Sequence, residues 1–144
     1  MTPQQIQLVQ STWKMVVPIA DTAAVLFYDR LFVLDPSLAP MFGKDMAEQR
    51  RRVMTMIGVA VTGLTRVDTI VPVLKGLGAR HLGYGVKDEH YATVGAALLW
   101  TLEQGLGPAF TAEACDAWLS AYTIIVTTMQ EGAREATERQ RLAA

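Results

Sequence analysis

The sequence contains little cysteine and little histidine. Its 144 residues include one cysteine, Cys115, and two histidines, His81 and His90. A single cysteine cannot form a disulfide within the chain, and it cannot build a zinc ribbon or an iron–sulfur cluster, because both need several thiolate ligands. The composition therefore favours a reducing compartment and excludes multi-thiolate metal sites.

Long apolar runs and an excess of charge of one sign are also missing. No stretch approaches the roughly eighteen apolar residues of a membrane helix, and the first residues lack the basic and apolar regions of a secretion signal. Thirteen basic residues face fourteen acidic ones, for a net charge of −1, which gives no field that attracts nucleic acid or an anionic membrane. The sequence predicts a soluble cytoplasmic protein without such partners, and leaves open whether it is a monomer or a homodimer.

Apolar residues recur at helical spacing along nearly the whole chain. The hydrophobic fraction is 51%, and no segment alternates apolar and polar residues over the length of a strand. The sequence therefore predicts an all-α fold in one domain, residues 1–144, around a single core. The expected helices begin after Thr2 and near residues 20, 45, 69, 88 and 112, and the last continues from about residue 132 as a charged extension.

Capping and helix-breaking residues set the expected helix ends. The segment Thr2-Pro3-Gln4-Gln5 has the pattern of a capping box with proline at the first helical position. Asp35-Pro36 ends the second helix, because the residue before a proline avoids helical geometry. Thr69 is expected to start the helix near that position, and the mid-helix glycines Gly58 and Gly95 suggest close helix crossings.

His81 is the leading candidate for a metal ligand. It shares an apolar helix face with Leu77, and glycines at 83 and 85 break the helix behind it. A neutral imidazole can bind a metal through one ring nitrogen while the other donates to Tyr91 or to a backbone carbonyl. Zinc is disfavoured because no set of histidine, cysteine or carboxylate residues at ligand spacing accompanies His81, whereas a haem needs only one axial histidine. A hydrogen-bonded core histidine remains the alternative, and His90 is expected to be a helix-start residue only.

Tyr28 and Gln49 are candidates for the opposite side of such a cofactor. Each is a polar residue on an otherwise apolar helix face, and a buried polar group without a partner costs about 1–3 kcal/mol. They could point at a bound gas, or they could hydrogen-bond to each other within an ordinary core.

The chain is similar to bacterial single-domain globins, to the globin part of flavohaemoglobins and to animal neuroglobins. The order and spacing of several short segments carry this resemblance over residues of about 5 to 132. They are Leu26-Phe27-Tyr28-Asp29-Arg30-Leu31-Phe32, Asp35-Pro36 leading to Phe42, Arg80-His81, Gly85-Val86, His90-Tyr91 and Leu106-Gly107-Pro108-Ala109-Phe110. The resemblance implies a globin fold around one haem b.

The resemblance also implies roles for individual residues. His81 matches the proximal iron ligand, and Phe42 matches the ring that wedges the haem. On the distal side, Tyr28, Gln49 and Val53 match the residues over the iron. The remaining cofactor contacts expected from similar globins are Leu77, Val86 and Tyr91, with Arg52 and Arg80 either at the haem propionates or simply solvated.

Two departures from these relatives change the expected chemistry. At the position of Gln49, neuroglobins have a histidine that serves as a sixth iron ligand. The amide of a glutamine is a poor iron ligand, so the ferrous iron of this chain should keep an open coordination position. Flavohaemoglobins couple the proximal histidine to a tyrosine and a glutamate, and Ala133 stands at the glutamate position. Glu131 lies nearby but about 200° away around a helix. The proximal side therefore favours gas binding over peroxidase-like chemistry.

The resulting expectation is reversible binding of O₂, NO and CO at ferrous haem. A nitric oxide dioxygenase that converts NO and O₂ to nitrate is the alternative. The 144 residues leave no room for a flavin or nicotinamide domain, so such turnover would need a separate reductase. A haem-free helical interaction module is the remaining class.

Overall fold

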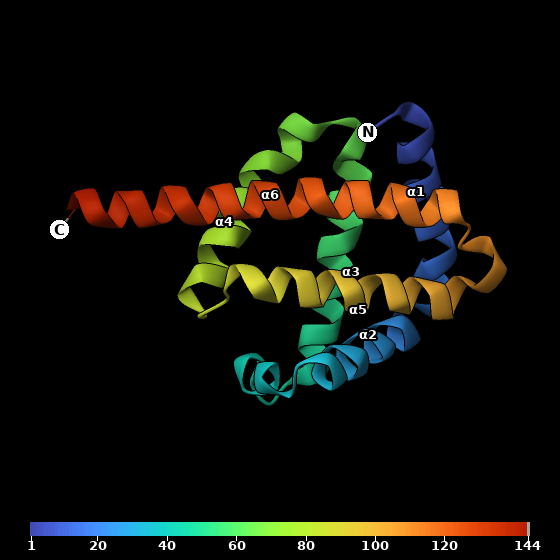
Figure 1. The fold of residues 1–144 in the computed structure, drawn as a ribbon, viewed down its shortest axis with the longest axis horizontal. Coiled ribbons are helices and arrows are strands. Elements are labelled where there is room, and N and C mark those ends of the chain that lie inside the picture. Colours follow the sequence, from blue (N-terminus) through green and yellow to red (C-terminus); the bar gives the residue numbers. More distant parts are fainter. Residues whose placement is uncertain (144) are drawn as a thin grey trace.

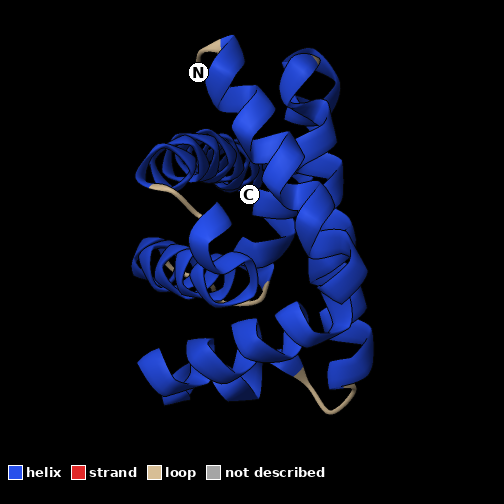
Figure 2. Ribbon diagram, turned by 90° about the vertical axis from the view of Figure 1, so that its right-hand side faces the viewer, coloured by secondary structure: helices blue, strands red, loops and turns tan. Residues whose placement is uncertain are grey.

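The protein, described by a computed structural model over residues 1–143, consists of helices joined by short turns (Figures 1 and 2). The α-helices are α1 (Pro3–Val16), α2 (Ala20–Leu34), α3 (Met46–Thr62), α4 (Val67–Gly83), α5 (Asp88–Leu106) and α6 (Ala112–Ala143). Short 3₁₀ segments lie between them, namely η1 (Val17–Ile19), η2 (Pro36–Phe42), η3 (Gly63–Thr65) and η4 (Gly107–Ala109). No strand occurs in residues 1–143. The predicted all-α class is therefore confirmed.

Capping side chains define the starts of α1 and α3, whereas the start of α4 differs from the prediction. The backbone N–H of Gln5 donates to Thr2 Oγ1 at 3.1 Å, and the Thr2 N–H donates to Gln5 Oε1 at 2.9 Å, which completes the predicted capping box. The start predicted for α4 at Thr69 is wrong, because the helix begins at Val67. The Thr69 hydroxyl donates to the Arg66 carbonyl at 2.7 Å. Thr69 thus lies inside the first turn instead of capping it.

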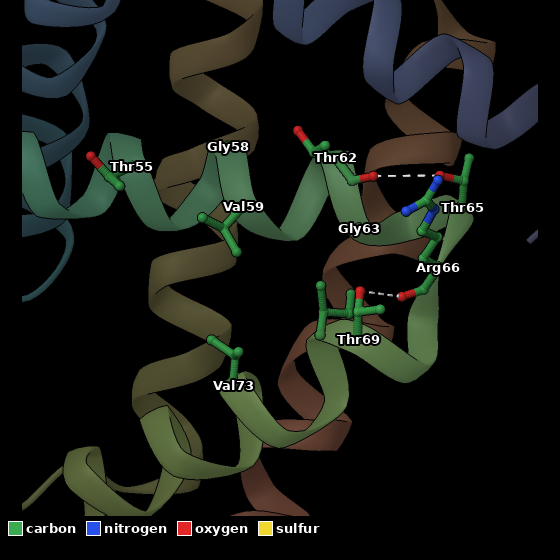
Figure 3. Close-up of a pocket in the computed structure, with 10 residues that line it drawn as sticks. Thr55, Gly58, Val59, Thr62, Gly63, Thr65, Arg66, Thr69 and Val73 are labelled. Carbon is green, nitrogen blue, oxygen red and sulfur yellow. Dashed lines mark hydrogen bonds between the residues drawn. The ribbon is translucent and has the colours of Figure 1, made fainter.

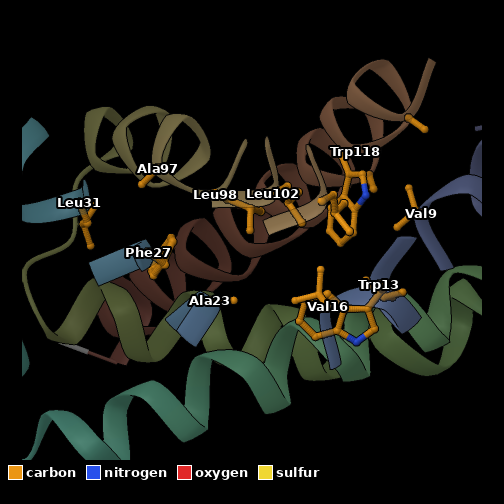
Figure 4. Close-up of a cluster of buried hydrophobic side chains, with 14 of the residues drawn as sticks. Val9, Trp13, Val16, Ala23, Phe27, Leu31, Ala97, Leu98, Leu102 and Trp118 are labelled. Atoms are coloured by element: carbon orange, nitrogen blue, oxygen red, sulfur yellow. The ribbon is translucent and has the colours of Figure 1, made fainter. Parts of the chain in front are cut away.

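The main hydrophobic core joins α1, α2, α5 and α6. Trp118 of α6 is 2% exposed and its ring centroid lies 6.1 Å from that of Trp13 in α1 (Figure 4). The indole N–H of Trp118 donates to Thr12 Oγ1 at 2.8 Å, so the buried polar atom is satisfied. Phe27 and Leu31 of α2 also belong to this cluster. This core holds α2 in place and thereby positions its tyrosine, Tyr28.

A close crossing of α4 and α6 fixes the position of the other candidate residues. A Cβ atom on Gly78 would meet the backbone of Met129, and one on Gly132 would meet the backbone of Lys75. The two backbones therefore touch, as two glycines allow. Lys75 Nζ also pairs with Glu135 Oε1 at 2.8 Å. The crossing lies one turn before His81 on α4.

A second hydrophobic cluster lies beside this crossing. Its buried members are Ile70, Leu74, Tyr91 and Met129, with Leu77, Val86, Ile125 and Val126 packed against them.

The last helix, α6, continues past the second hydrophobic cluster to Ala143 and projects beyond α4 in Figure 1. Leu142, near the end of this helix, is 76% exposed. Within residues 1–143, no helix has the combined length and apolar content that crossing a membrane requires.

Candidate functional site

His81 lies in the last turn of α4 and is half-buried. Its Nδ1 atom is 2.8 Å from the carbonyl oxygen of Leu77. A carbonyl oxygen only accepts hydrogen bonds, so Nδ1 must carry the ring proton and Nε2 keeps its lone pair. Burial lowers the pKa of His81, assisted by the positive charge of Arg80 and opposed by the hydrogen bond to Leu77. The imidazole is therefore neutral near pH 7, with a free nitrogen of the kind that binds a metal.

His90 has the opposite arrangement of its ring nitrogens. The backbone N–H of Lys87 donates to His90 Nδ1 at 2.9 Å, at the start of α5. The lone pair of Nδ1 is thus occupied, and Nε2 carries the proton. The side chain is 8% exposed and serves the helix start, as predicted. Of the two histidines, only His81 is prepared as a ligand.

The question of which group orients His81 is resolved by the Leu77 carbonyl. Tyr91 lies in the second hydrophobic cluster and is 9% exposed. Burial raises the pKa of Tyr91, and the carboxylate of Asp88 raises it further. The Tyr91 backbone oxygen accepts a hydrogen bond from the Tyr122 hydroxyl at 2.5 Å. Tyr91 therefore shapes the surroundings of α4 and does not supply the partner of the imidazole.

Tyr28 lies on α2 in a group of aromatic rings. Its ring centroid is 5.0 Å from Phe27, 5.9 Å from Phe32 and 5.3 Å from Phe42. The hydroxyl donates to the backbone oxygen of Gln49 at 3.3 Å. Burial raises the pKa of Tyr28 to about 12, although the positive charge of Arg50 acts in the opposite direction. The phenol thus remains neutral and able to donate a proton in a hydrogen bond across the physiological range.

Gln49 lies in the first turns of α3 and is half-buried. Its side-chain Nε2 donates to the Phe42 carbonyl at 3.4 Å. The structure therefore brings Tyr28 and Gln49 together, but their side chains do not hydrogen-bond to each other. Both observed bonds exceed the usual 2.7–3.2 Å of good hydrogen bonds. Weak bonds of this kind leave the Tyr28 hydroxyl and the Gln49 amide free to exchange partners.

The remaining predicted residues fall into two groups. Phe42 and Val53 pack against the main core near Tyr28, whereas Leu77 and Val86 pack in the second cluster near His81. Within residues 1–143 the two groups share no hydrogen bond and no hydrophobic cluster. The structure thus assembles a polar group on α2 and α3 and a histidine-bearing group on α4 and α5, each surrounded by apolar side chains.

The two predicted arginines lie at the surface. Arg52 Nη2 pairs with Glu48 Oε1 at 2.7 Å, one turn earlier on α3, and both side chains are largely exposed. This pair supports the interpretation of Arg52 as a solvated residue. Arg80 is exposed and has no ion pair within residues 1–143. It is free to reach an anionic group beside His81.

Tyr84 is a neighbour of His81 that sequence reasoning missed. Its ring centroid lies 6.0 Å from the imidazole at an interplanar angle of 58°, and the side chain is 63% exposed. The residue follows the end of α4, between two glycines of the turn. The short separation of three residues from His81 was the available signal, because it corresponds to almost one helical turn.

The donor set fits a haem. No group of three or more histidine, cysteine or acidic side chains in residues 1–143 could hold an isolated metal ion. A haem brings its own four nitrogen ligands and requires one axial side chain in an apolar setting. His81 offers that nitrogen. The hydrogen-bond partner of the His81 ring is a backbone carbonyl, and the charge that acts on the His81 pKa is the positive charge of Arg80.

Comparisons with known proteins identify the family of the chain. The globin family model matches residues 25–129. Neuroglobin of Danio rerio is 31% identical over 139 residues, covering 87% of each chain.

Solved structures share the fold. A bacterial globin from Campylobacter jejuni has a TM-score of 0.85 at 24% identity, covering 95% of this chain and 99% of its own. An engineered carbene transferase from Rhodothermus marinus, described as a candidate nitric oxide dioxygenase, has a TM-score of 0.85 at 19% identity and covers 100% of this chain and 99% of its own. Because the globin family model matches residues 25–129 and the Danio rerio neuroglobin is 31% identical, the chain belongs to the globin family, and this membership implies a haem-binding protein.

Proposed function

We propose that this globin binds O₂, and likewise NO and CO, reversibly at a haem b whose axial ligand is His81. The observation that carries the proposal is the hydrogen bond between His81 Nδ1 and the Leu77 carbonyl at 2.8 Å. That bond leaves Nε2 unprotonated and restricts the orientation of the ring. A ferrous haem supplies the metal site to which a diatomic gas coordinates.

The distal residues supply selectivity for a polar gas. Tyr28 holds a neutral hydroxyl whose present partner, the Gln49 backbone oxygen, lies 3.3 Å away. The hydroxyl can turn from this weak bond to a partly negative ligand atom and donate a stronger, charge-assisted bond. Gln49 can support it through its amide, which is held at 3.4 Å from the Phe42 carbonyl. Such donors favour O₂ over the less polar CO.

The structure also supports an open position for the gas. Neither histidine lies on α3, the helix that carries Gln49 and Val53. An amide is a poor ligand for iron, so neither Gln49 nor Val53 competes with the gas for the distal position. Val53 adds an apolar surface one turn after Gln49. At the edge of the proximal group, Arg80 is the cation that we assign to a haem propionate.

Nitric oxide dioxygenation is a second candidate function that uses the same distal donor. The overall conversion is NO plus O₂ plus one electron to nitrate, and a separate reductase would supply the electron. The buried, neutral Tyr28 hydroxyl favours nitric oxide dioxygenation as much as it favours reversible gas binding. The proximal side favours binding alone, because His81 is paired with a carbonyl and no carboxylate makes it a stronger electron donor.

The test combines cofactor identification with an equilibrium measurement. The pyridine adduct of the cofactor should give the spectrum of haem b, and the reduced protein should form an oxygenated spectrum that reverts when O₂ is removed. Failure to retain haem, or a reduced form that does not take up O₂, would contradict the proposal. Multiple turnovers of NO to nitrate with a supplied reductase would instead assign the enzyme function.

A further inference from the structure

A surface cavity of about 840 Å³ lies at the corner where α3 passes through η3 into α4 (Figure 3). Its lining comes from the second half of α3 and the first turns of α4 and contains none of the residues assigned above to haem or gas binding. The volume falls within the range of roughly 300–1,000 Å³ that is typical of small-molecule sites. The cavity is therefore large enough for a ligand of its own.

The walls of the cavity are mostly apolar. Val59 of α3 and Val73 of α4 lie on opposite sides of it in Figure 3. They are 42% and 41% exposed, so both present apolar surface to solvent. Ile70, which belongs to the second hydrophobic cluster, also lines the cavity. An apolar chain laid between the two valines would remove this surface from water.

The one charged residue of the lining is Arg66, at the rim. Its side chain is exposed and forms no ion pair within residues 1–143. Asp68, the nearest acidic residue in the sequence, does not line the cavity. In Figure 3 the Arg66 guanidinium lies beside Thr65, at the end of the cavity formed by η3. A positive group therefore stands at one end of an apolar trough that carries no negative charge.

The threonines of the lining leave this charge as the dominant polar feature. The Thr65 hydroxyl donates to the Thr62 carbonyl at 3.5 Å, and the Thr69 hydroxyl donates to the Arg66 carbonyl at 2.7 Å. The Thr55 hydroxyl donates to the Arg51 carbonyl at 2.9 Å. Three of the four threonine hydroxyls are thus directed at the backbone, and the guanidinium carries the charge of the lining, so it is the group best able to bind an anion.

We propose that this cavity binds a medium-chain carboxylate, with the acyl chain between Val59 and Val73 and the carboxylate at Arg66. The lining of α3 runs from Thr55 to Thr62, which corresponds to about 10 Å along the helix. That length suits an acyl chain of about ten carbons, and the guanidinium is well shaped to hold a carboxylate through two parallel hydrogen bonds. The site is independent of the gas-binding function.

Calorimetric titration of the haem-loaded, CO-saturated protein tests this assignment, because haem and CO keep the probe out of the gas site. The probe is decanoate, compared with butyrate and with decyltrimethylammonium. Decanoate should bind, butyrate should bind far more weakly because it buries less apolar surface, and the cation should bind more weakly than decanoate. Equal binding of decanoate and the cation would overturn the proposal.

Variants locate the binding site. Arg66→Gln should weaken decanoate binding about two- to fivefold, as expected for an exposed ion pair, whereas Arg134→Gln, which removes an exposed arginine on α6, should leave it unchanged. Val59→Trp or Val73→Trp should fill the cavity and abolish binding, and both positions are exposed enough to accept the larger ring. Unchanged binding in both tryptophan variants would place decanoate elsewhere and contradict the proposal. A dimer that dissociates in Val59→Trp would assign the cavity to a second copy of the chain and would also contradict it.

Discussion

The ring of His81 is oriented by the backbone of its own helix, since Nδ1 lies 2.8 Å from the carbonyl oxygen of Leu77, four residues earlier. The Leu77 carbonyl lies within the continuous helix α4, so helical geometry already fixes its position as an acceptor for the His81 ring. The arrangement selects one tautomer without a second side chain. In the proposed role of axial ligand, the His81 imidazole would therefore be neutral and of moderate basicity, which suits reversible binding.

The two histidines should show opposite tautomers. His81 is expected to carry its proton on Nδ1, because that atom faces a carbonyl oxygen, and His90 on Nε2, because its Nδ1 accepts from the Lys87 N–H. Two-bond proton–nitrogen correlation spectra of the CO form distinguish the two patterns. A proton on Nε2 of His81 would remove the lone pair that the proposed ligand role requires.

Replacing Tyr28 with phenylalanine should speed O₂ dissociation. The loss of a charge-assisted hydrogen bond of about 1.5–3 kcal/mol corresponds to an acceleration of roughly ten- to a hundredfold. Stopped-flow displacement of O₂ by CO measures this rate. Tyr122→Phe is the matched control, because it also removes a buried hydroxyl, one that donates to the Tyr91 backbone on the proximal side. An O₂ dissociation rate that is the same in Tyr28→Phe and wild type would disprove the distal role of Tyr28.

Tyr28 should also lower stability at alkaline pH. Its pKa is raised from 10.0 to about 12 in the folded protein, so above pH 10 the unfolded chain releases a proton that the folded chain retains. Stability is therefore lost as pH rises from 10 toward 12, by at most about 2–3 kcal/mol from this group. Urea unfolding at pH 8 and at pH 11 should show a smaller loss in Tyr28→Phe than in wild type. Equal losses would mean that the phenol ionises as readily when folded.

Alanine at Gly78 should destabilise the protein by about 2 kcal/mol or more, because its Cβ would meet the backbone of Met129, which cannot move aside as a side chain can. Gly76→Ala is the control on the same helix. A Cβ there meets only Arg80 Nη1 at 3.6 Å, so the substitution should be neutral or stabilising by up to about 1 kcal/mol. Thermal or urea unfolding compares the two, and similar stabilities would refute the tight crossing of α4 and α6.

Local patterns in the sequence were sufficient for the helices and for most of their ends. The capping box at Thr2 and the stop at Asp35 depend on neighbouring residues only, and both are present. The start of α4 was misplaced because its cap position is Arg66, which provides no side-chain cap. Thr69 resembled a cap but donates its hydroxyl to the Arg66 carbonyl. The sequence pattern therefore predicted helix α4 correctly but placed its start two residues too late.

Contacts between distant helices could not be read in the same way. Gly58 and Gly95 were both expected at close helix crossings. A Cβ at Gly95 would indeed lie 2.6 Å from the Tyr122 ring, whereas one at Gly58 would make only ordinary contact with Trp13 Nε1 at 3.5 Å. The tighter crossing at Gly78 and Gly132 joins residues far apart in the chain, and one sequence contains no signal that pairs them. Likewise, Tyr28 and Gln49 were placed on the same side, but the bond from the Tyr28 hydroxyl to the Gln49 backbone depends on how α2 meets α3.

The central claim, that His81 is the axial ligand, is tested most directly by resonance Raman spectra of the reduced, ligand-free protein. Wild type and His90→Ala should show an iron–histidine stretching band, and His81→Ala should lose it. An unchanged band in His81→Ala, or a band lost in His90→Ala alone, would show that His81 is not the axial ligand.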